Sequence, residues 1–107
     1  MPYFLVQASY SAEAAAHLVQ HPQHREQALK KTCETLGGKL HAFYYCFGEY
    51  DAIALLELPD NRAAAAMSLS ADASGALKKI RTTVLLTVAE AMDAMKQAQS
   101  DQYKPPA

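Results

Sequence analysis

The chain has 107 residues, of which 50% are hydrophobic and 20% charged, a composition typical of one globular domain rather than a disordered segment. Ten basic and eleven acidic side chains give a net charge of −1, so no positive excess indicates nucleic acid or an anionic membrane as a partner. Charged residues interrupt every apolar stretch that approaches the length of a membrane span.

The N-terminal residues and the two cysteines favour a cytoplasmic location. The segment 1–7 has no basic region, and its apolar run is too short for a signal peptide. Cys33 and Cys46 form no CxxC pair, so we expect two free thiols in a reducing compartment. A reactive thiol is the alternative, and it would need positive charge or a helix N-terminus nearby.

Apolar periodicity predicts the elements, and cap and turn residues indicate their ends. Ser11 is the expected cap of a short helical turn, and Pro22 suits the first turn of the helix that follows. Gly37-Gly38 ends that helix, and Asp60 or Asn61 caps a later one. In chain order we expect a strand over 3–10, a helical turn over 11–20, a helix over 22–36, strands over 39–47 and 52–58, a helix over 61–72, a strand over 77–88 and a helix over 89–98.

This order of elements predicts an α+β, ferredoxin-like βαββαβ fold with an additional C-terminal helix. The right-handed crossover rule places the first and third strands in the centre of a four-stranded antiparallel sheet. Both main helices then cover one face of the sheet. We expect one domain over residues 1–98 and a flexible tail over 99–107.

Alternation along the strands predicts which side chains share a face. The residues of the fourth strand expected to face the helices are Ile80, Thr82, Val84, Leu86 and Val88. The opposite face, which we call the mixed face, is expected to combine large apolar with polar side chains: Leu5, Phe43, Tyr45, Ile53, Leu55 and Leu85 beside Gln7, Ser9, His41, Glu57, Lys79 and Arg81.

A solvated face rarely holds so many large apolar groups together. We therefore expect the mixed face to pack against a second copy, in a homodimer or higher even-numbered oligomer of the dimeric α+β-barrel type. Two interpretations stay open. The face is an interface alone, or it also forms a small-molecule pocket lined by Gln7, Ser9, His41, Tyr45, Lys79 and Arg81.

Histidines and basic residues offer weaker signals. His17, His21 and His24 have helical spacing that suits a metal, but Pro22 breaks the helix between them, which favours surface histidines. We predict no metal site and no cofactor.

A basic pair lies in the fourth strand. Lys79 and Arg81 share a face of that strand, where they could bind a carboxylate or phosphate. The alternative is that these two basic side chains balance the charge of Asp51 or Glu57 across the sheet.

No P-loop, nucleophile elbow or zinc-protease motif is present in the sequence. The enzymatic alternative is a cofactor-independent oxygenase or isomerase, in which His41, Tyr45 or Asp51 moves a proton and Lys79 or Arg81 stabilises an anion. Haem or metal binding through a histidine is a further alternative.

Gly48, Glu49, Tyr50 and Asp51 form a tight connection in which Gly48 allows a positive φ. With Gly48, Tyr50 and Asp51 in this spacing, the chain resembles the GYD-domain family. The resemblance spans about residues 3–95, and its other motifs are Leu36-Gly37-Gly38-Lys39-Leu40, Leu58-Pro59-Asp60-Asn61 and Arg81-Thr82-Thr83-Val84-Leu85-Leu86-Thr87. It implies a ferredoxin-like domain related in shape to dimeric α+β-barrel proteins, and it carries over no catalytic residue.

Overall fold

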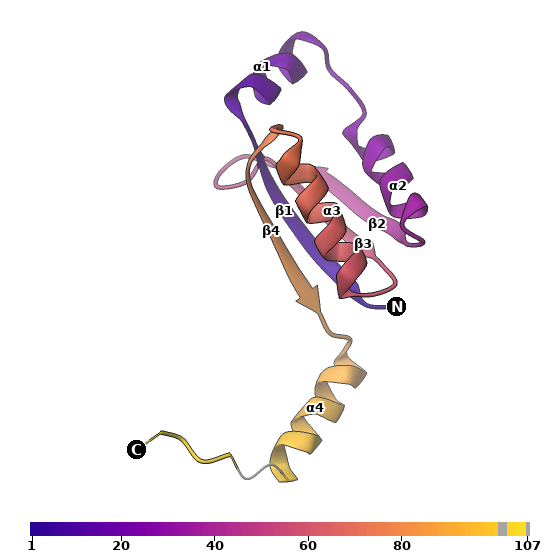
Figure 1. The fold of residues 1–107 in the computed structure, drawn as a ribbon, viewed down its shortest axis with the longest axis vertical. Coiled ribbons are helices and arrows are strands. Elements are labelled where there is room, and N and C mark those ends of the chain that lie inside the picture. Colours follow the sequence, from indigo (N-terminus) through magenta and orange to yellow (C-terminus); the bar gives the residue numbers. More distant parts are fainter. Residues whose placement is uncertain (101–102, 107) are drawn as a thin grey trace.

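The strands and helices follow one another in the predicted order. A computed structural model describes residues 1–100 and 103–106 (Figure 1). Its elements are β1 (Tyr3–Tyr10), α1 (Ala12–Gln20), α2 (Arg25–Thr35), β2 (Lys39–Tyr45), β3 (Ala52–Glu57), α3 (Asn61–Ala73), β4 (Leu77–Leu85) and α4 (Val88–Ser100).

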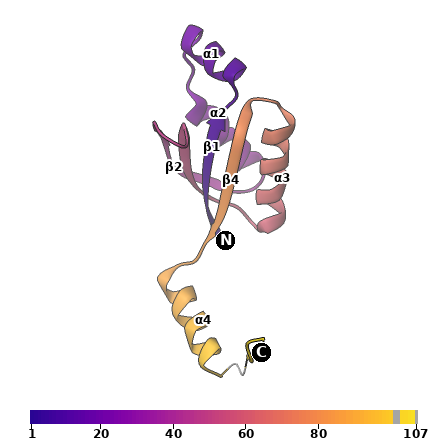
Figure 2. The same ribbon diagram turned by 90° about the vertical axis from the view of Figure 1, so that its left-hand side faces the viewer.

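The four strands form one sheet in the order β2-β3-β1-β4, and every neighbouring pair is antiparallel. This is the ferredoxin-like topology, with β1 and β3 in the centre as predicted. Figure 2 shows that α2 and α3 cover one face of the sheet and that the other face is open. The α+β fold class is therefore confirmed.

Two of the three helix starts for which the sequence indicates a residue are confirmed. The side chain of Ser11 accepts a hydrogen bond from the Ala14 amide, and Asp60 accepts one from the Ala63 amide. The expected place of Pro22 in the first helical turn is wrong. His24 has a non-helical backbone (φ −82°, ψ 82°), so α2 begins only after it and Pro22 lies in the preceding connection.

The core lies between the sheet and the two covering helices. Its most buried side chains come from the central strands, α2 and the segment after β3: Phe4, Leu56, Cys33 and Leu58. Cys33 and Cys46 are both free thiols, as expected. Burial raises the pKa of the Cys33 thiol, which disfavours the reactive thiolate form.

A β-bulge in β2 changes which side chains face the helices. Leu40 lies opposite Leu56, but Ala42 lies opposite Leu55, so His41 is an extra residue in the ladder. Beyond it the alternation is reversed. Phe43 packs against the core instead of lying on the mixed face.

Tyr45 follows the same reversal, so its expected location on the mixed face is also wrong. It lies opposite the helix-facing Ala52, and its hydroxyl donates to the carbonyl oxygen of Gln23, just before α2. Its ring makes an edge-on contact with the ring of Phe43.

Two further residues expected on the helix-facing side of the fourth strand lie outside that strand. β4 ends at Leu85, so Leu86 belongs to the connection and Val88 begins α4. Ile80 packs against the core, whereas the side chain of Val84 is 52% exposed near the end of the strand.

α4 extends away from the sheet (Figure 1) and makes no more than marginal contact with any other element of the described residues. It reaches Ser100, two residues past the predicted helix end. The predicted tail over 99–107 therefore begins within the helix, and residues 101, 102 and 107 lie outside the described ones.

Gly38, just before β2, provides a test of the close approach to the end of β3. A Cβ at this position would collide with the carbonyl oxygen of Glu57 and lie 2.7 Å from Cδ2 of Leu58. We expect Gly38→Ala to lower the free energy of unfolding by about 2–4 kcal/mol, because backbone cannot move aside cheaply. Urea denaturation measures the loss.

The control is Gly75→Ala, where no neighbouring atom lies within 4 Å and only the backbone (φ +77°) is strained. This variant should lose about 1 kcal/mol. Equal losses in the two variants would contradict the close approach at Gly38.

Candidate functional site

The mixed face has an apolar centre. In the sheet register Leu5 lies between Leu55 and Thr83, and Gln7 lies between Ile53 and Arg81. The larger side chains along this centre are only half-buried, because their neighbours on the same face shield them partly: Tyr3, Leu5, Ile53, Leu55 and Leu85.

At one end of the mixed face, the side chains of His41 and Glu57 contact each other. His41 Nε2 lies 2.8 Å from Glu57 Oε1, and the two side chains are 28% and 19% exposed. The ring of Tyr3 lies 5.4 Å from the His41 ring. His41 follows the alternation that begins at Lys39, so it lies on the mixed face as predicted, and the bulge changes the faces only of the residues after it.

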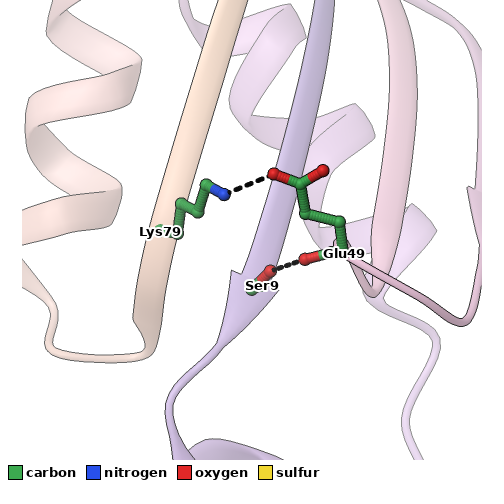
Figure 3. Close-up of polar contacts among 3 residues, drawn as sticks. All are labelled: Ser9, Glu49 and Lys79. Carbon is green, nitrogen blue, oxygen red and sulfur yellow. Dashed lines mark hydrogen bonds and ion pairs between the residues drawn. The ribbon is translucent and has the colours of Figure 1, made fainter.

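The other end of the mixed face is covered by the β2–β3 loop, residues 46–51 (Figure 3). The hydroxyl of Ser9 donates to the carbonyl oxygen of Glu49 at 2.8 Å, and Lys79 Nζ donates to Glu49 Oε1 at 2.7 Å. Lys79 Nζ also lies 4.9 Å from the centre of the Tyr50 ring, within cation–π range. The loop therefore binds β1 and β4 together across the sheet.

Gly48, Tyr50 and Asp51, which carry the resemblance to the GYD-domain family, have structural roles in this loop. Gly48 has the positive φ (+133°) that its place in the connection predicted. The Tyr50 ring is buried against the sheet. The Asp51 carboxylate accepts a hydrogen bond from the backbone amide of Tyr10 at 2.9 Å, and its own amide donates to the Ala8 carbonyl oxygen.

The ion pair between Glu49 and Lys79 is exposed but alters both side chains. The hydrogen bond from Lys79 lowers the pKa of Glu49, and the same bond raises the pKa of Lys79. Because Lys79 is already paired, it is less available to an external anion than the sequence suggests.

The three candidate proton-transfer residues are not brought together. His41 contacts Tyr3 at the start of β1, whereas Asp51 binds the amide of Tyr10 at its end. Seven residue steps of about 3.3 Å separate these ends by about 23 Å. Tyr45 lies on the helix-facing side. This arrangement offers no shared site for acid–base chemistry among the three.

The helix-facing side contains a cavity of about 300 Å³, which we call the inner cavity, between α2, α3 and the sheet. α2 packs mainly on β2 and α3 mainly on β4, so the helices leave the central strands between them uncovered. Small side chains occupy those strands at this point, namely Ala8, Ala52 and Ala54. Together the splayed helices and the alanines leave the space unfilled.

A second hollow of about 330 Å³, the outer cavity, lies beside α1. Tyr10, Arg25 and Ser74 line both cavities, so they stand where the two meet. Neither Arg25 nor Ser74 belongs to a sequence pattern that indicates a functional role. The run of alanines in the helix-facing set of the central strands, which ends at Tyr10, is the signal that could have indicated the cavity.

His17, His21 and His24 form no metal site in the part of the chain that the structure describes. His17 and His21 stack with ring centres 4.8 Å apart. Across residues 1–100 and 103–106, no three His, Cys, Asp or Glu side chains gather where they could hold a metal ion. Over the same residues, none of the helices combines the length and hydropathy needed to cross a membrane.

The loop with Gly48, Tyr50 and Asp51 lies within the part of the chain that matches a known protein family. The GYD domain matches residues 4–95. The chain belongs to the GYD domain family. The fold of this GYD domain is also similar to the crystal structure of FFRP-DM1, with a TM-score of 0.49 and 14% identity over 80% of this chain and 100% of that chain. No curated protein matches it in sequence.

The Glu49–Lys79 contact can be tested by titration. We expect Lys79→Met to raise the pKa of Glu49 towards the ordinary glutamate value, because the variant removes both the hydrogen bond and the positive charge. NMR titration of the side-chain carboxyl carbon measures this. The matched control is Lys78→Met, which removes a neighbouring exposed charge that makes no ion pair with Glu49 among the described residues. If the two variants shift Glu49 equally, the specific contact is wrong.

Proposed function

We propose that this GYD domain functions as a homodimer in which the mixed faces of two copies pack together. The observation that carries the proposal is the open, largely apolar centre of the mixed face, which no helix of the described chain covers (Figure 2). Half-buried leucine and isoleucine side chains on three strands gain most from a second layer, since burial stabilises by about 25 cal/mol per Å² of apolar surface.

The polar groups at the two ends of the mixed face support assembly more than ligand binding there. His41 is paired with Glu57, Lys79 with Glu49, and the Ser9 hydroxyl with the Glu49 carbonyl oxygen. A ligand would have to replace these contacts. Paired charges, in contrast, let two copies approach without strong repulsion.

α4 supplies the second support. Its exposed apolar residues Val88, Met92 and Met95 recur at helical spacing and form one stripe. A helix of 13 residues is marginal in water without a packing surface. The chain thus carries both an uncovered sheet and an unpaired helix, and a two-fold arrangement of identical copies covers both at once.

The dimensions favour a second copy that uses both features. A sheet of four strands spaced about 4.8 Å apart and about 26 Å long offers about 500 Å². A standard interface takes about 800 Å² from each partner. α4, about 20 Å long and 10 Å wide, adds about 200 Å² and makes up most of the difference.

Leu55→Asp tests the mixed face. We expect this variant to be monomeric where the parent chain is dimeric, because a carboxylate at the centre of the interface would be buried without a partner. Sedimentation equilibrium measures the mass. Leu69→Asp, at a 69%-exposed position of α3, is the matched control and should leave the mass unchanged.

Circular dichroism shows whether Leu55→Asp is folded. If it is not, Thr83→Glu puts a charge at an exposed position of the same face and serves in its place. A folded variant that keeps the parental mass contradicts the proposal, and so does a parent chain that is monomeric.

The contribution of α4 is tested by the double variant Met92→Asp/Met95→Asp. We expect the dissociation constant of the dimer to rise at least tenfold, because two apolar side chains of the stripe are lost from the interface. Gln97→Asp, on the opposite side of the same helix, is the control. An unchanged dissociation constant in the double variant would mean that α4 stays outside the interface.

A further inference from the structure

The inner cavity combines an apolar wall with a single charge. Among the described residues that line it, Arg25, the first residue of α2, is the only one with a charged side chain. The rest of the lining is mainly aliphatic or small, with Leu29, Met67 and Ile80 among the larger members. Cavities of this kind bind ligands whose body is apolar and whose orientation is fixed by few polar contacts.

The side chain of Arg25 is available to an anion. Its hydrogen bond to Gln23 Oε1 is long at 3.4 Å, its other polar neighbour is the Tyr10 side chain, and it makes no ion pair within residues 1–100 and 103–106. A guanidinium binds a carboxylate through two parallel N–H donors. Arg25 also stands at the N-terminus of α2, where His24 provides no side-chain cap, so the positive end of the helix adds to the attraction.

The Tyr10 hydroxyl is the second donor at this place. Burial, with Tyr45 nearby, raises the pKa of Tyr10 although Arg25 acts in the opposite direction. The phenol, which is protonated at neutral pH even at its ordinary pKa, therefore keeps its proton and can donate a hydrogen bond. Tyr10 and Arg25 both line the junction of the two cavities. An anionic group placed there reaches both donors while its body extends into the inner cavity.

We propose that the inner cavity binds a small apolar monocarboxylate, with its chain between α2, α3 and the sheet and its carboxylate against Arg25 and Tyr10. One cation balances one carboxylate, and Glu13 in the outer cavity disfavours ligands of higher negative charge. At about 30 Å³ per water-sized group, the cavity of about 300 Å³ holds about ten such groups. An acid of about eight carbons has this size.

The site lies on the opposite side of the sheet from the mixed face, so it is open in a monomer and in the proposed dimer alike. Its test therefore does not depend on the state of assembly. Octanoate is the probe, and octan-1-ol, which has the same chain without the charge, is the matched ligand control. Isothermal titration calorimetry gives the affinities, and methyl NMR shifts locate the ligand.

We expect octanoate to bind at least tenfold more tightly than octan-1-ol, and to shift the methyl signals of Leu29, Met67 and Ile80. Arg25→Gln should weaken octanoate about tenfold or more and weaken octan-1-ol much less, since it removes a charge-assisted bond that only the carboxylate makes. Lys31→Gln, which removes an exposed charge from the same helix outside the cavity, should have no effect.

Ala71→Phe tests the cavity itself, because it adds bulk to a lining position of α3 and should abolish binding of both ligands. Circular dichroism checks that this variant is folded, and Arg25→Gln decides the question if it is not. No binding of octanoate to the parent chain, equal affinity for the two ligands, or no effect of Arg25→Gln overturns the proposal. Shifts confined to Leu5 and Leu55 also overturn it, since they locate the ligand on the mixed face.

Discussion

β2 pairs with β3 on both sides of His41, but the extra residue there reverses the alternation of side chains along the strand. The bulge decides which side chains of β2 after His41 lie on each face of the sheet. Before it, Leu40 contributes to the core, and at it His41 meets Glu57 on the mixed face. After it, Phe43 turns to the helices. Without the bulge, Phe43 and Tyr45 would replace Tyr44, which now lies opposite Ile53 on the mixed face, and the inner cavity would lose one of its walls.

Alanines in the central strands make the helix-facing side of the sheet different from the mixed face. Ala8, Ala52 and Ala54 are too small to fill the space between splayed helices, so the helix-facing side keeps a cavity. On the mixed face the same strands carry leucine and isoleucine, which form a broad surface instead. A hollow on one side and a flat apolar surface on the other suit a domain that self-associates through one face and keeps the second for a ligand.

The fold was predictable because strand and helix periods, caps and glycines all favour one topology. Ser11, Asp60 and Gly48 perform the local roles expected of them. The location of Tyr45 was not predictable, because a bulge depends on pairing with β3 and leaves no mark in the alternation of β2 itself. Arg25 was missed for a similar reason: its role follows from where α2 begins and from the cavity beside it.

The β2–β3 loop connects the two faces physically. Glu49 and Tyr50 lie against Ser9 and Lys79 on the mixed face, while Asp51 binds the backbone amide of Tyr10. The pairing of β1 with β4 changes register between Ser9 and Tyr10, so the ladder alone does not fix the end of β1. The Asp51 carboxylate fixes it instead, and the Tyr10 side chain lines the junction of the two cavities. The Gly-x-Tyr-Asp loop on one side of the sheet therefore positions a hydrogen-bond donor on the other.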